Sequence, residues 1–240
     1  LDIAAEEPDR EVVFLGVGFE TTAPGTAIAV REARDRGLKN FSVLSLLKRT
    51  ESALRALIGS PDFQVSGFLC PGHVATIVGA DGFAFLSREY GIPSVVGGFE
   101  AGDILAAVYR LLRQIKEGVP RLENEYTRAV TPEGNPMARA VMAEAFTYRD
   151  DVWRGLGIIP DSGYGLRPEF AAFDAERKFP FHPEDKEAVT GCKCGEIICG
   201  HREPMQCPLF GTACVPENPV GPCMVSSEGA CAAAYKYQRL

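Results

Sequence analysis

The chain has 240 residues, 46% of them hydrophobic, with a formal net charge of -7 and a pI of ≈ 5.1. A chain of this length can bury a core without disulfides or metals, and its acidic balance disfavours a non-specific grip on nucleic acid, which depends on Lys and Arg. No apolar stretch approaches the ~20 residues of a membrane span and no secretory signal is visible, so we expect a soluble cytoplasmic protein without nucleic-acid or membrane partners.

The first part of the chain alternates between strand and helix patterns. It begins with Leu1 and a polar loop, from which we expect a fragment. Residues 11–18 form an apolar run ending in glycine, which is typical of a parallel strand buried on both faces. Further strands are predicted over 41–46, 65–70 and 94–98, and helices over 26–37, 50–59, 73–90 and 101–117. Residues 1–118 are therefore predicted to form a Rossmann-like α/β domain with a parallel sheet.

The periodicity weakens after this domain. Residues 138–146 keep a helical pattern, and residues 153–167 are expected to be irregular because they are rich in Gly and Pro. We interpret residues 119–180 as a connector packed against another part of the protein. The composition of residues 181–240 then changes abruptly, with Pro, Gly and Cys dominating. Such a segment needs a stabilising cross-link, such as a bound metal or disulfides, to be ordered. We expect a small loop-rich domain there.

Polar side chains follow three of the predicted strands. Glu20 and Thr21 follow the first, His73 follows the strand at 65–70, and Glu100 follows the strand at 94–98. We expect them to converge at the edge of the sheet where α/β proteins bind ligands. The alternative for the turn with Thr21 is a threonine helix cap, and the alternative for His73 is a capping or buried role. The turn after residue 18 lacks the last glycine of G-x-G-x-x-G and a Walker lysine, so it is a weak fingerprint for a dinucleotide or phosphate.

Cysteines are concentrated near the C-terminus, where seven of the eight fall between Cys192 and Cys231. Such clustering in a cytosolic protein indicates metal ligation rather than disulfides. We favour an iron–sulfur cluster, with zinc or free thiols as alternatives. Cys199 lies in an apolar run and is expected to be a core residue. The remaining candidate ligands are Cys192, Cys194, Cys207, Cys214, Cys223 and Cys231.

Several segments together resemble the HypD family of hydrogenase maturation proteins. They include FLGVGFETTAPGTA (14–27), GFLCPGHVATIVGA (67–80), GIPSVVGGFEAGDIL (91–105), WRGLGIIPDSGYGLR (153–167) and CPLFGTACVPENPVGPCMVSSEGACAAAY (207–235). The match runs over nearly the whole chain in the family's order, and CMVSSEGACAAAY is the most specific segment.

The resemblance implies a role in building the Fe(CN)2CO centre of [NiFe] hydrogenases. Family members hold a [4Fe-4S] cluster in a C-terminal domain, pair with the chaperone HypC as a scaffold for the iron, and engage HypE, which supplies cyanide. The resemblance thus implies a redox-active scaffold rather than a turnover enzyme, with the cluster in residues 181–240. It also implies that residues 119–180 pack on an N-terminal α/β domain that this chain lacks.

The chain departs from the family pattern at two places. The CGTH and GPGCPVC motifs, whose thiols the family uses for iron binding and redox work, are absent, and Leu47 stands before Lys48 where the family commonly has histidine. Two alternatives therefore stand beside a hydrogenase maturation factor. One is a nucleotide- or phosphate-binding α/β enzyme with a structural zinc tail, and the other is a truncated, inactive remnant.

Overall fold

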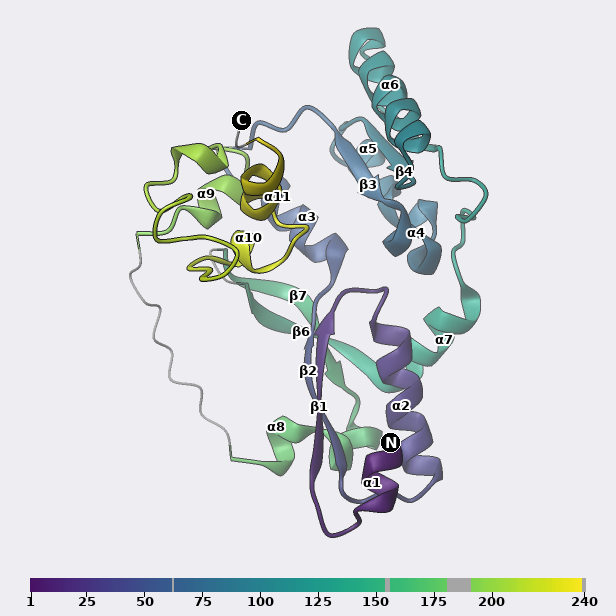
Figure 1. The fold of residues 1–240 in the computed structure, drawn as a ribbon. Coiled ribbons are helices and arrows are strands. Elements are labelled where there is room, and N and C mark those ends of the chain that lie inside the picture. The colour runs from purple at the N-terminus through teal and green to yellow at the C-terminus, as the bar shows by residue number, and fades with distance from the viewer. Residues whose placement is uncertain (62, 154–155, 181–190, 239–240) are drawn as a thin grey trace. The chain divides into compact units, whose positions relative to one another are not determined.

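The computed structural model of the protein describes residues 1–61, 63–153, 156–180 and 191–238 (Figure 1). They belong to two compact units, each formed by three segments of the chain. The first unit comprises Leu1–Ala53, Ser66–Asp151 and Pro160–Phe181, and the second comprises Leu54–Val65, Val152–Ile159 and His182–Leu240. The predicted α/β class is confirmed, while the predicted domain boundaries at residues 118 and 180 stay predictions.

The first unit contains a parallel sheet of strands β1 (Val12–Gly18) and β2 (Phe41–Leu47), with Val12 opposite Phe41. The short helix α1 (Asp2–Glu6) precedes this sheet. Helix α2 (Ala23–Asp35) connects the strands, and its buried face includes Ala27 and Val30. The chain leaves α2 through Gly37, whose φ of 66° lies in the left-handed region that favours glycine. Figure 1 shows β1 and β2 running side by side.

A second parallel sheet in this unit has the strand order β3-β4-β5. Its strands are β3 (Phe68–Pro71), β4 (Ser94–Gly97) and β5 (Leu122–Asn124). The helical elements around it are α4 (Gly72–Val78), η1 (Ala80–Phe83), α5 (Ala84–Arg88) and α6 (Ala101–Glu117). The expectation of one sheet is therefore wrong for the described residues, because β2 pairs with β1 and not with β3.

The segment after β5 holds helix α7 (Pro136–Ala145), which packs against α2, and strands β6 (Phe146–Trp153) and β7 (Gly157–Leu166). The prediction that residues 153–167 are irregular is wrong, since most of them lie in β7. Among the described residues, this strand pairs with β6 in a two-stranded sheet. Pro160 lacks a backbone N–H, and it is tolerated in an edge strand because one side of such a strand has no neighbouring strand to accept hydrogen bonds. Helices η2 (Pro168–Phe173) and α8 (Ala175–Lys178) follow.

The second unit has short helices and a core made largely of cysteines. Its described helices after residue 190 are α9 (Cys194–Ile198), η3 (Pro204–Gln206), α10 (Pro222–Val225) and α11 (Ala230–Tyr237). Helix α3 (Thr50–Ile58) has residues in both units. In the part of the chain that the structure describes, no helix has the length and apolar character needed to cross a membrane.

Candidate metal centre

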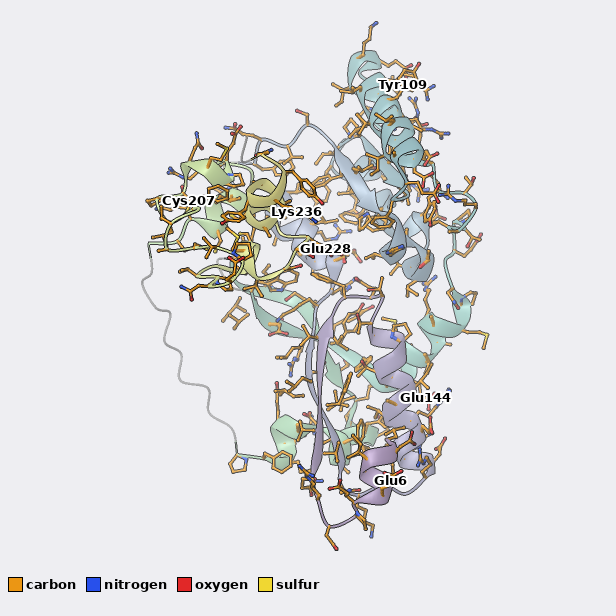
Figure 2. The ribbon with its side chains drawn as sticks, in the orientation of Figure 1. Glu6, Tyr109, Glu144, Cys207, Glu228 and Lys236 are labelled. Atoms are coloured by element: carbon orange, nitrogen blue, oxygen red, sulfur yellow. The ribbon has the colours of Figure 1, made fainter. Side chains whose placement is uncertain are left out.

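All six predicted cysteine ligands line one cavity in the second unit. The cavity is formed by Cys192, Cys194, Cys207, Cys214, Cys223 and Cys231, together with Ile197, Phe210, Gly221 and Met224. Cys199 is only half-buried and does not line it. Figure 2 labels Cys207 in the same part of the chain where Figure 1 labels α9, α10 and α11. Segments as far apart as α9 and α11 thus bring their thiols to one place.

Burial favours the neutral form of four of these thiols. It is the main cause that raises the pKa of Cys192, Cys194 and Cys231, and together with the neighbouring Cys231 it raises the pKa of Cys223 to about 12. Four thiolates without a cation would repel one another in this apolar surrounding. Metal ions or an iron–sulfur cluster bind thiolates, so ligand binding at this cavity must release protons.

The backbone approaches the sulfurs closely at two neighbouring residues. The Val220 amide lies 3.3 Å from Cys214 Sγ and donates a hydrogen bond to it. A Cβ added to Gly221 would lie 2.4 Å from Cys192 Sγ, closer than real Cβ contacts allow. A glycine here lets the loop wrap around the thiols, and amide donors to sulfur suit an anionic cluster. Clustered thiols, an amide donor to sulfur and apolar walls are the chemical groups that an iron–sulfur site uses.

The thiols are packed together rather than held apart. The cavity between them measures ≈ 10 Å³, about the space of one water molecule. Among the described residues, no three His, Cys, Asp or Glu side chains are arranged to hold a metal ion.

Glu20 is buried in the first unit, with 2% of its surface exposed. Its carboxylate accepts hydrogen bonds from the Thr50 amide at 2.8 Å and the Thr50 hydroxyl at 2.6 Å, and the Tyr164 hydroxyl also contacts it. Burial first, and then the charge of Glu20, raise the pKa of Tyr164. Because Thr50 is the first residue of α3, Glu20 satisfies the first donors of that helix from a distant loop. The neighbouring Thr21 is exposed.

His73 and Glu100 lie at the carboxyl ends of β3 and β4. The exposed His73 ring contacts Phe99, with ring centroids 4.0 Å apart. Glu100 caps α6 in a capping box with Asp103, and its side chain is 82% exposed. The prediction that Glu20 joins these residues at one edge is wrong, because Glu20 follows β1 in the other sheet.

Two residues at this strand end were missed by sequence reasoning. Arg128 binds Asp103 through two hydrogen bonds of 2.7 Å and 2.6 Å and lies 3.4 Å from Glu100. The Arg128 guanidinium lowers the pKa of the Asp103 carboxyl and has its own pKa raised. The spacing of Glu100 and Asp103 in a capping-box pattern could have revealed the acidic partner. Nothing in the sequence near Arg128 points to its role.

Cys70 is separate from the six clustered thiols. It is a core residue of β3 with 2% of its surface exposed, and burial raises the pKa of its thiol to about 12. This environment suits an inert structural cysteine rather than a nucleophile.

Comparison with known proteins places the whole chain in one family. A family profile described as HypD, hydrogenase formation hypA family, matches residues 1–238. The hydrogenase maturation factor HypD of Azotobacter vinelandii is 45% identical over 245 residues, covering 100% of this chain and 65% of that protein. The factor of the same name from Cupriavidus necator is 46% identical over 246 residues, with 100% and 65% covered.

The similarity extends to archaea and has the same span. A putative hydrogenase expression/formation protein of Methanocaldococcus jannaschii is 41% identical over 239 residues, covering 99% of this chain and 66% of that protein. The chain thus spans 65% of the length of the two bacterial relatives, which is less than two thirds. On the family profile and these identities, the chain belongs to the HypD family.

Proposed function

We propose that the chain acts in hydrogenase maturation as the part of a HypD protein that holds a [4Fe-4S] cluster. The observation that carries this proposal is the gathering of six thiols around one cavity. Their number suits a site with four thiolate ligands and two further thiols. Family membership gives the biological setting, since the relatives are named as hydrogenase maturation factors.

Four of the six thiols are proposed as ligands. The Cys231 thiol shares a hydrogen bond with the Cys223 thiol and also interacts electrostatically with Cys207, Cys214 and Cys192. The Cys223 thiol differs from the others because it donates to the Cys194 carbonyl oxygen at 3.8 Å, and the Cys194 thiol interacts with Cys192 and Cys223 but not with Cys231. We therefore assign Cys192, Cys207, Cys214 and Cys231 to the cluster. Cys194 and Cys223 then remain beside it as a second pair of thiols.

The side chains around this cavity control access of water and protons. The apolar Ile197, Phe210 and Met224 line it, so they shield the sulfurs from solvent. The Val220 amide stabilises negative charge on Cys214 by its hydrogen bond. When bound, a [4Fe-4S] cluster would supply or accept single electrons.

The cargo of the proposed site is the iron centre of a [NiFe] hydrogenase. We propose that the longer protein carries Fe(CN)2CO as it is assembled, together with a HypC-type chaperone and a HypE-type cyanide donor, in the cytoplasm. The exposed strand-end residues His73 and Glu100 are candidates for contact with these partners. Pull-down experiments with each partner, on this chain and on the full-length Azotobacter protein, would show which of the two proteins binds the partner. If neither protein retained either partner, the scaffold role would be contradicted.

The cluster is tested by anaerobic purification of the chain and measurement of its visible spectrum, iron, sulfide and zinc. We expect a broad visible absorption with iron and sulfide bound. Cys231→Ser should lose most of this iron, whereas Cys199→Ser should keep it because Cys199 does not line the cavity. A colourless protein that contains zinc would overturn the proposal.

A further inference from the structure

The first unit contains a large cavity that the cysteine cluster does not explain. It measures ≈ 780 Å³, within the usual size of small-molecule sites. Its walls come from α4, η1 and α7, from β6 and β7, and from the residues that lead into α3. Neither His73 nor Glu100 lines it.

Most of the cavity wall is apolar or aromatic. Val74 and Ile77 of α4 lie on it, as do Met142 of α7, Phe146 and Tyr148. The Arg49 guanidinium lies over the Tyr148 ring, 4.1 Å from its centroid. This contact holds a cation against a flat apolar surface, an arrangement that also suits an aromatic ligand beside them.

The charged groups on the cavity offer more donors than acceptors. Both carboxylate oxygens of Glu20 accept hydrogen bonds from Thr50, and Glu51 binds Arg49 at 2.5 Å. Arg139 donates to the Glu133 carbonyl at 3.0 Å and makes no ion pair with a described residue.

Arg167 adds to this surplus of donors. It donates to the Ala143 carbonyl at 3.3 Å, and its nearest carboxylate, on Glu169, is 3.7 Å away. Each guanidinium has five N–H donors, so Arg139 and Arg167 keep donors that no described side chain fully uses.

We propose that this cavity binds a small organic anion, with a carboxylate or phosphate group on a flat apolar body. Arg139 and Arg167 would bind the anionic group, because guanidinium forks match the geometry of both oxyanions. The apolar wall around Phe146 and Tyr148 would take the body of the ligand. A neutral ligand would leave the arginine donors without acceptors, and a cation would be repelled.

A set of related probes tests the proposal on the full chain by ligand-observed NMR titration. Phenyl phosphate and benzoate carry the two kinds of anionic group, benzamide is the neutral analogue of benzoate, and inorganic phosphate lacks the apolar body. We expect the aromatic anions to bind at millimolar concentrations, with benzamide and inorganic phosphate about tenfold weaker. The stronger of phenyl phosphate and benzoate identifies the class of the natural anion.

Matched variants assign the binding to the arginines. Arg139→Gln and Arg167→Gln should each weaken binding of the aromatic anions about tenfold and leave benzamide unchanged. Arg177→Gln removes an exposed arginine outside the cavity and should change nothing. The chain should bind the probes equally well with and without bound iron, so the result is independent of the cluster. Equal binding of benzamide and benzoate, full binding by both cavity variants, or no binding of any probe would overturn the proposal.

Discussion

Replacement of Glu20 tests whether this buried carboxylate holds the fold of the first unit. Its two oxygens accept the amide and the hydroxyl of Thr50 at 2.8 Å and 2.6 Å, and its side chain is almost fully buried. A hydrogen bond to a charged group contributes about 1.5–3 kcal/mol. Glu20→Gln keeps one acceptor and should lower the free energy of unfolding by about 2 kcal/mol. Glu20→Ala loses both and leaves the Thr50 donors unpaired, so about 3–5 kcal/mol is expected.

Urea unfolding followed by circular dichroism measures these changes, provided that wild type and variants unfold in one transition. Thr50→Val removes the hydroxyl but keeps the amide, and a double-mutant cycle with Glu20→Gln should show a coupling of about 1–2 kcal/mol. Glu32→Gln is the control, because the Glu32 side chain is 51% exposed and, among the described residues, its ion pair is with Arg36. This variant should change the free energy of unfolding by less than about 0.5 kcal/mol. A Glu20→Gln variant as stable as the control would refute the anchoring role.

Three further outcomes are expected. Gly221→Ala should lower the iron content of the anaerobically purified chain, since the added Cβ would lie 2.4 Å from Cys192 Sγ. Gly102→Ala is the control and should keep its iron, because no atom lies within 4 Å of the added Cβ. Equal iron in both variants would contradict this packing. Cys70 should resist iodoacetamide at pH 8 in the native protein and react after denaturation, because burial raises its pKa to about 12; mass spectrometry showing rapid native labelling would argue against it. Arg128→Gln should move the acid unfolding midpoint to higher pH, because Arg128 lowers the pKa of the Asp103 carboxyl. This lowered pKa stabilises the fold at pH values above the carboxyl's ordinary pKa of about 3.9. The stabilisation is lost as the pH falls through the lowered pKa. An unchanged midpoint in an acid titration followed by circular dichroism would count against that pair.

Local sequence patterns predicted the helices and strands whose conformation depends mainly on their own residues. The apolar run before Gly18 forms β1 as predicted, and the periodic pattern over 101–117 forms α6. The expected burial of β1 on both faces is wrong for the described residues, because most of its apolar side chains, such as Leu15 and Val17, are exposed. The division into two sheets was not predictable in this way, because it depends on which strands pair across the chain. Strand β7 was not predicted, because Pro160 and the glycines of this strand are more typical of loops than of strands. Leu47 is fully buried, so the position where the family commonly has histidine belongs to the core in this chain.

The candidate sites were predictable to different degrees. The density of cysteines near the C-terminus indicated a common thiol site, and the cavity brings the six candidates together. The contact of Gly221 with Cys192 depends on a loop conformation that no motif specifies. The arginines of the large cavity come from segments far apart in the sequence, so only folding reveals that Arg49, Arg139 and Arg167 share one space.

Mössbauer spectroscopy of the anaerobically purified chain, labelled with isotopically enriched iron, tests the proposed cluster most directly. The assignment of Cys192, Cys207, Cys214 and Cys231 as ligands predicts the signature of a [4Fe-4S] cluster, retained in Cys70→Ser and lost in Cys207→Ser. Iron in a mononuclear site, or a chain that binds zinc in place of iron, would contradict it.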